Sequence, residues 1–162
     1  MIFHINRMAF KSGLSEEQRR ACLDAVRQAG AANPAVKSYV VGPELGGEFE
    51  YGAVYVVEDL DGYWAYLEYP PHVREELWGI PHLEKFAAID VSDSDDPQLG
   101  EKIAALQARH LQDGPAGVPE PGDVQEEPPA GLLQGQLEPG PAVEVVIGEQ
   151  VNVVTPHGQA SG

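Results

Sequence analysis

Residues 66–73 read Tyr66-Leu67-Glu68-Tyr69-Pro70-Pro71-His72-Val73. Pro70 and Pro71 have no backbone N–H to donate, and Pro71 disfavours helical geometry at the residue before it. A helix that enters this stretch should therefore stop near Tyr69. A second short helix can begin at Pro71, because proline is favourable in a first turn. The break can turn Tyr66 and His72 toward the same space, which two residues six apart on one straight helix would not share. A hydroxyl and an imidazole brought together in this way can form an acid–base site.

The N-terminal segment, residues 2–10, has the pattern of a β-strand. Alternation places His4 and Asn6 on one face and Phe3 and Ile5 on the other. Both faces are partly apolar, as expected for a strand that is covered on both sides.

The next segments predict one helix and a pair of strands. A capping box at 15–18 begins a helix that should run to about residue 29, with Gly30 just beyond its end. Residues 36–41 and 49–57 are rich in β-branched and aromatic side chains and should pair as antiparallel strands.

The second half of the domain repeats the helix-then-strand order. Asp59 or Asp61 should cap the helix that leads into the Pro-Pro break, and residues 73–86 should be helical, with interruptions. Residues 87–91 predict the fourth strand. The resulting order, β-α-β-β-α-β over residues 1–92, is the ferredoxin-like α+β pattern.

A single four-stranded sheet with helices on one face would leave Phe3 and Ile5 exposed in a monomer. A homodimer that packs two such sheets together into an α/β barrel would cover this face.

The C-terminal third has a different composition. Residues 93–114 predict an additional helix, and residues 115–141 are rich in Pro, Gly and acidic residues, which is typical of a flexible linker. Within residues 142–162, two apolar segments predict a β-hairpin. A lone hairpin is marginally stable, so we expect it to add to a sheet edge, with the partner subunit's sheet as one option.

Charge and cysteine content restrict the partners and the location. The formal net charge is −16, and from residue 112 onward there are acidic residues but no Lys or Arg. Such a chain repels nucleic acid and acidic membrane surfaces, so neither is expected as a partner. Cys22 is the single cysteine, which excludes an internal disulfide and fits a cytoplasmic location. No apolar run is long enough for a membrane span.

The order of these segments, together with His4, Tyr66 and the run Tyr69-Pro70-Pro71-His72-Val73, resembles the stress-responsive dimeric α/β-barrel (Dabb) family over about residues 1–92. Members of that family typically read His-Pro-x-His-Val, so Tyr69 departs from the pattern and His72 keeps it. The resemblance extends to plant polyketide cyclases of the olivetolic acid cyclase type. It implies that Tyr66 and His72 form a catalytic pair and that His4 lines a pocket.

The resemblance also implies an acid–base reaction on a small-molecule substrate. Neutral His72 would remove a proton next to a carbonyl, and Tyr66 would donate a hydrogen bond to the developing enolate oxygen. The expected reaction is an aldol-type cyclisation of a polyketide-like chain, of the lyase or cyclase class. The side chains expected to bind the substrate are His4, Asn6, Trp64 and Trp78.

Several alternatives remain open on the sequence alone. Tyr66 and His72 could simply bond backbone groups that the Pro-Pro break leaves free. His4 could be a satisfied core histidine, and Trp64 and Trp78 could be core or pocket wall. Other functions compatible with the fold are a cofactor-free monooxygenase of a phenolic substrate and a non-catalytic ligand-binding stress protein.

The remaining polar residues give little sign of a metal site. Cys22 has no companion ligand, and Asp95 and Asp96 are explained by the start of a helix. We therefore expect neither a metal ion nor an organic cofactor. The other three histidines, His82, His110 and His157, are expected to be solvated.

Overall fold

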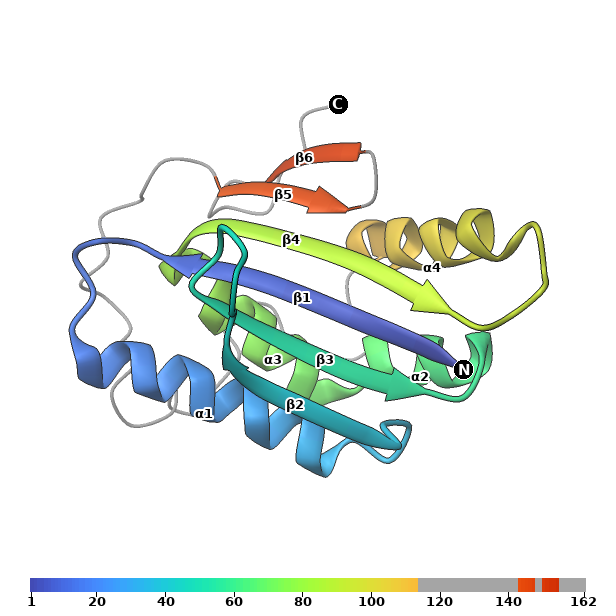
Figure 1. The fold of residues 1–162 in the computed structure, drawn as a ribbon, viewed down its shortest axis with the longest axis horizontal. Helices are drawn as coiled ribbons and strands as arrows, with labels where there is room; N and C mark the ends of the chain where they lie inside the picture. Colours follow the sequence, from blue (N-terminus) through green and yellow to red (C-terminus); the bar gives the residue numbers. More distant parts are fainter. Residues whose placement is uncertain (114–142, 148–149, 155–162) are drawn as a thin grey trace.

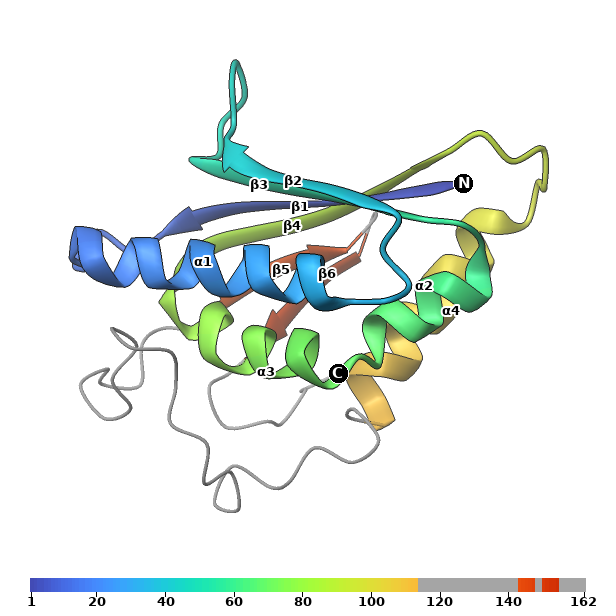
Figure 2. The same ribbon diagram turned by 90° about the horizontal axis from the view of Figure 1, so that it is seen from below.

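The computed structural model describes residues 1–113, 143–147 and 150–154, in which helices lie on one face of a single β-sheet (Figures 1 and 2). The elements, in chain order, are β1 (Ile2–Phe10), α1 (Glu16–Ala32), β2 (Ser38–Pro43), β3 (Tyr51–Val57), α2 (Leu60–Leu67), α3 (Pro70–Gly79), a short 3₁₀ helix η1 (Ile80–His82), β4 (Leu83–Ser92), α4 (Leu99–Asp113), β5 (Val143–Ile147) and β6 (Gln150–Val154).

The strand order in the sheet is β2-β3-β1-β4-β5-β6. The first four strands are antiparallel and have the predicted ferredoxin-like arrangement. β5 pairs in parallel with β4 of the same chain, and β6 pairs antiparallel with β5. The predicted linker at 115–141 lies outside the described residues. The division into a domain at 1–92, a helix at 93–114 and a hairpin tail at 142–162 stays a prediction.

β1 separates the two faces of the sheet as its alternation predicts. The side chains of His4 and Asn6 are buried on the face that the helices cover. Phe3 and Ile5 are half-buried on the opposite face, which no helix covers in the described part of the chain (Figure 2). The sheet therefore keeps one apolar face open.

The capping box of α1 forms as predicted, but the predicted end of this helix is wrong. The backbone N–H of Gln18 donates to the Ser15 hydroxyl, and the Gln18 side chain accepts from the Ser15 backbone. The helix continues past Gly30 and is capped at Asn33. Gly30 is required for close packing instead, since a Cβ there would lie 2.6 Å from Cε1 of Tyr55.

Replacing Gly30 by Ala is therefore expected to destabilise the fold, although alanine is the better helix former. The added methyl must displace either the Tyr55 ring or α1, and such overpacking costs about 1–3 kcal/mol. Urea unfolding of the two proteins measures the difference. Gly100→Ala is the matched control, because a Cβ at that helical position meets nothing within 4 Å and should leave stability unchanged or raise it. Equal behaviour of the two variants would contradict the packing role of Gly30.

The Pro-Pro break forms where it is predicted, whereas the strand that follows starts earlier than predicted. α2 ends at Leu67 and α3 begins at Pro70. β4 begins at Leu83, so residues 83–86, which we expected to be helical, are strand paired with β1. Gly79 and Pro81 already interrupt the helical segment, and pairing with β1 then overrides the helical tendency of these residues.

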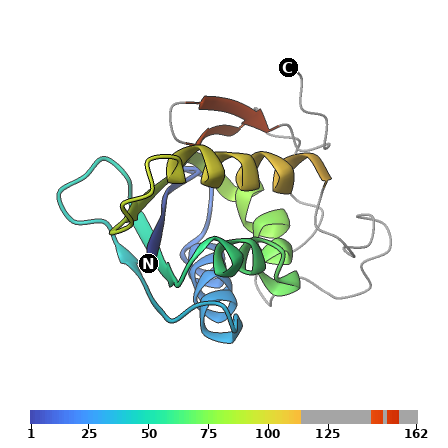
Figure 3. The same ribbon diagram turned by 90° about the vertical axis from the view of Figure 1, so that its right-hand side faces the viewer.

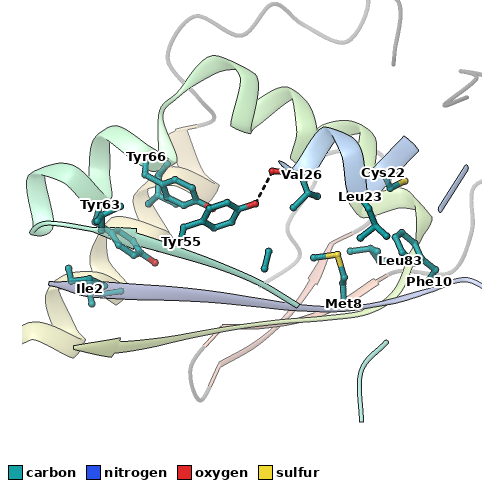
Figure 4. Close-up of a cluster of buried hydrophobic side chains, with 14 residues drawn as sticks. Ile2, Met8, Phe10, Cys22, Leu23, Val26, Tyr55, Tyr63, Tyr66 and Leu83 are labelled. Carbon is teal, nitrogen blue, oxygen red and sulfur yellow. Dashed lines mark hydrogen bonds between the residues drawn. The ribbon is translucent and has the colours of Figure 1, made fainter. Parts of the chain in front are cut away.

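The core lies between the sheet and the helices (Figure 4). Tyr55, Tyr63 and Tyr66 are almost completely buried there, and the Tyr55 hydroxyl donates to the carbonyl of Val26 on α1 at 3.1 Å. This phenol cluster places large polar-tipped rings where most cores hold aliphatic side chains. No helix among the described residues is both long and apolar enough to cross a membrane.

Candidate active site

The structure brings Tyr66 and His72 together. Tyr66 lies on the last turn of α2 and His72 on the first turn of α3, so the Pro-Pro break folds one ring over the other. Their ring centroids are 4.3 Å apart with a tilt of 31°. Both residues are deeply buried, with relative exposures of 1% and 2%. The catalytic roles of the pair stay predictions.

The polar atoms of this pair are not used to hold the break together. The Tyr66 hydroxyl and both ring nitrogens of His72 are buried and have no hydrogen-bond partner among the described residues. The carbonyl of Tyr69 is instead taken by the backbone N–H groups of His72 and Val73. A buried polar group without a partner costs about 1–3 kcal/mol, so its retention calls for another explanation.

Two carboxylates on α3 flank the His72 imidazole. Glu75 Oε2 lies 3.5 Å from Nδ1 and Glu76 Oε1 lies 3.4 Å from Nε2. These distances are long for hydrogen bonds but lie within the range of ion pairs. Burial alone would lower the pKa of His72, but the nearby carboxylates outweigh it and raise the pKa to about 10. We expected a neutral His72 that acts as a base; the flanking charges make it an imidazolium at neutral pH.

Glu75 and Glu76 differ in their own titration. Burial raises the pKa of Glu75 above its usual range, against the opposing effect of His72. Burial would also raise the pKa of Glu76, but His72 and a hydrogen bond from His110 hold it well below the usual range. Of the two carboxyls, Glu75 is therefore the one better placed to exchange a proton near neutral pH.

His110 belongs to this cluster, contrary to our expectation that it is solvated. It is buried, and its Nε2 lies 2.9 Å from Oε2 of Glu76. The buried face of α4 runs through Ile103 and Gln107 to His110, an i, i+4, i+7 spacing that places all three side chains on one side of the helix.

His4 forms a second cluster next to Tyr66. Its Nδ1 lies 2.9 Å from Asp90 Oδ1 and 3.0 Å from the Tyr63 hydroxyl. The His4 ring centroid lies 5.4 Å from that of Tyr66. Asp90, Tyr63 and their partner Gln107 were not among the predicted site residues, because nothing local in the sequence links them to His4.

A small cavity opens beside His72. Its polar lining includes Asn6, His72, Glu75 and Glu76, and the rest of its lining comes from β1, α1, β3, β4 and the α3–η1 segment. The space open to water-sized molecules is about 30 Å³, which is room for one or two waters. Oδ1 of Asn6 is buried and has no partner in the described residues. Tyr66 does not line the cavity, but its ring lies next to that of His72, which does.

Neither predicted tryptophan lines this cavity. The Trp64 ring lies under the guanidinium of Arg109, at 4.2 Å from its centroid. Trp78 is half-buried against the core, and its carbonyl lies 2.7 Å from Nδ1 of His82. His82 is therefore buried, not solvated as we expected, and burial lowers its pKa. Substrate binding by Trp64 and Trp78 stays a prediction.

The described residues contain no group of three or more His, Cys, Asp or Glu side chains arranged to hold a metal ion. The titratable side chains at the site are an imidazolium, two carboxyls of different proton affinity and a buried phenol.

Comparison with known proteins agrees with the fold. A family model described as "Stress responsive A/B Barrel Domain" (Dabb) matches residues 2–93. A dimeric ferredoxin-like protein of unknown function from Thermobifida fusca is 26% identical, with a TM-score of 0.51, over 56% of this chain and 89% of that one. No curated protein sequence matches.

Two plant structures share the fold at lower identity. The protein At3g17210 from Arabidopsis thaliana is 18% identical, with a TM-score of 0.53, over 59% of this chain and 97% of that one. A hydroxynitrile lyase from Passiflora edulis is 18% identical, with a TM-score of 0.52, over 57% of this chain and 94% of that one. At this identity the similarity extends to the fold alone.

Proposed function

The chain belongs to the stress-responsive A/B barrel (Dabb) family, and we propose that it is a small-molecule enzyme that works by acid–base chemistry at a carbonyl group without a cofactor. The observation that carries this proposal is a set of buried polar atoms that lack hydrogen-bond partners among the described residues: Asn6 Oδ1 and the His72 nitrogens in the cavity lining, and the hydroxyl of the adjacent Tyr66. A polar ligand that bonds to Asn6 and Tyr66, and to an imidazole that has only long ion-pair contacts, would stabilise these groups.

The roles follow from the charges at the site. Glu75, whose pKa burial raises, takes a proton from the carbon next to the carbonyl. Negative charge then develops on the carbonyl oxygen, where the His72 imidazolium stabilises it. Tyr66 supplies a second hydrogen-bond donor once the substrate reaches its hydroxyl. The enolate attacks a second carbonyl carbon, and the resulting alkoxide takes up the proton that Glu75 removed, which returns Glu75 to its starting state. The sum is an aldol-type carbon–carbon bond formation, and the reverse sequence is a lyase reaction.

The size of the cavity determines which substrates should be tested first. A polyketide-like chain, as in our cyclase prediction, requires the helices to move apart, because the space beside His72 holds only one or two waters. Small ketones, β-diketones and cyanohydrins need less room. A cyanohydrin is included because the Passiflora neighbour is named a hydroxynitrile lyase.

A screen of these compounds by mass spectrometry, with an oxygen electrode in parallel, tests the proposal. Product formed by the wild type but not by His72→Gln supports the acid–base enzyme. Product that forms only with oxygen uptake favours the monooxygenase alternative. Ligands that raise the melting temperature of both proteins equally, without product, favour the non-catalytic binding alternative.

We also propose that the protein is a cytoplasmic homodimer that pairs the open faces of two sheets. Apolar side chains line this face on neighbouring strands: Val54 and Ile89 stand opposite Ile5 in the β1–β3 and β1–β4 pairs. A patch of this kind is rarely left in water. The Thermobifida neighbour, described as dimeric, has the same fold.

Ile89→Lys is expected to shift the protein to a monomer in sedimentation equilibrium, because two buried lysines would face one apolar interface. Ile89 is 44% exposed in the single chain, so the substitution should leave the fold intact. Leu111→Lys, at a similarly exposed position on α4, is the control and should remain dimeric. A dimeric Ile89→Lys variant would place the interface elsewhere.

A further inference from the structure

α4 begins at Leu99, beyond the family domain that ends at residue 93, yet it lies along α2 (Figure 3), and His110 near its C-terminal end contacts Glu76 of α3. Ile103, Gln107 and His110 are its buried side chains, and they share one face of the helix. Ile103 joins the hydrophobic core. The other two carry polar groups to buried positions, which is costly unless those groups find partners.

Both polar side chains find carboxylate partners in the family domain. Nε2 of Gln107 donates to Asp90 Oδ2 at 3.1 Å and to the Tyr63 hydroxyl at 2.7 Å. Nε2 of His110 lies 2.9 Å from Oε2 of Glu76. α4 therefore reaches each of the two clusters described above.

Each of these carboxylates faces an imidazole with its other oxygen. Asp90 Oδ1 contacts His4, and Glu76 Oε1 contacts His72. The Tyr66 ring contacts both imidazoles, with its centroid 5.4 Å from that of His4 and 4.3 Å from that of His72. The site thus consists of two imidazole–carboxylate pairs that share one buried phenol as a neighbour, and a residue of α4 holds the carboxylate of each pair.

We propose that α4 is a working part of the acid–base site, in which Gln107 and His110 are positioning residues that hold Asp90 and Glu76 against His4 and His72. This inference rests on the proposed acid–base function and extends the site beyond the family domain. A helix that only covered the core would bury apolar side chains at positions 107 and 110.

The pKa of the Glu76 carboxyl can be used to test the positioning role of His110. The titratable groups around this carboxyl are His72 and Glu75 on α3, His110 on α4, Tyr63 and Tyr66 on α2, and Tyr55 on β3. The hydrogen bond from His110 favours the ionised form of Glu76. Removal of that donor should therefore make Glu76 easier to protonate, whereas a His110 that only covered the core, without a hydrogen bond to Glu76, could be replaced with no change in the Glu76 titration.

The test is a ¹³C NMR titration of the Glu76 carboxyl in the full-length chain, with helix content followed by circular dichroism. His110→Ala and His110→Leu both remove the donor, and we expect the pKa of Glu76 to rise by about one pH unit in each. His110→Gln, which restores a neutral donor, should give a smaller rise. Gln112→Ala, an exposed position on the same helix, is the control and should give none.

An unchanged Glu76 titration in either folded donor-less variant would overturn the proposal and leave α4 as a cover for the core. The titration uses no substrate, so its result stands whether or not the proposed reaction is found. Conversely, a shift in the Glu76 titration with no turnover in the compound screen would retain the positioning role and reject the enzyme.

Discussion

NMR titration of His72 is expected to find its imidazole still protonated at neutral pH, with a pKa of about 10. A buried histidine normally loses its proton more easily, because burial disfavours the charged ring. Here Glu76 and Glu75 lie within 3.4 Å and 3.5 Å of the two ring nitrogens and outweigh that effect. The folded-state pKa is above the ordinary 6.5, so the stabilisation is fully present below about pH 6.5 and is lost as pH rises through about 10.

Glu76→Gln should lower the pKa of His72 by about one pH unit or more, since it removes one of the two charges that oppose burial. Glu101→Gln, an exposed carboxyl on α4, is the control and should leave His72 unchanged. A wild-type His72 that titrates near 6.5, or a Glu76→Gln variant with an unchanged His72, would contradict the charge assignment.

Tyr66→Phe is expected to stabilise the protein while it removes most of its turnover. The Tyr66 hydroxyl is buried and has no partner among the described residues, so its removal should recover about 1–3 kcal/mol. The same change removes a donor to the developing oxyanion, and loss of one such donor lowers turnover by about 10²- to 10³-fold. Thermal or urea unfolding and a rate measurement on any compound from the screen give the two values.

Tyr55→Phe is the matched control. Tyr55 is equally buried and stacks on Tyr66, with ring centroids 5.1 Å apart, but its hydroxyl donates to Val26. Its loss should therefore destabilise the protein by about 1 kcal/mol. Opposite signs of the two stability changes are the expected outcome. If Tyr66→Phe is destabilising as well, then the Tyr66 hydroxyl has a structural partner and is not free to bind a ligand.

The fold and the meeting of Tyr66 with His72 could be predicted because their causes are local. Proline geometry ends one helix and begins the next within three residues. The capping box of α1 is likewise formed by side chains within four consecutive residues. The end of α1 could not be predicted in the same way. Gly30 looks like a helix terminator in sequence, and only the Tyr55 ring on a distant strand shows why glycine is there.

The sequence could predict which charged side chains lie beside His72, but not that they are buried. Glu75 and Glu76 follow His72 at i+3 and i+4, a spacing that places them beside the imidazole on a helix. Their burial depends on packing against α1 and α4, and a charged pair on a helix is usually solvated. The contacts of Gln107 and His110 with Asp90 and Glu76 join residues far apart in the chain, so the sequence pattern indicated a buried face but not its partners.

The most direct test of the acid–base claim is hydrogen–deuterium exchange at the carbon next to a carbonyl. Small ketones and β-diketones that raise the melting temperature of the protein are incubated in D₂O, and NMR follows the loss of their α-proton signal. We predict exchange with the wild type well above the buffer rate, and exchange near the buffer rate with Glu75→Gln and His72→Gln. If the wild type binds such a compound but leaves its α-protons unexchanged, the site is a binding pocket and the proposed chemistry is wrong.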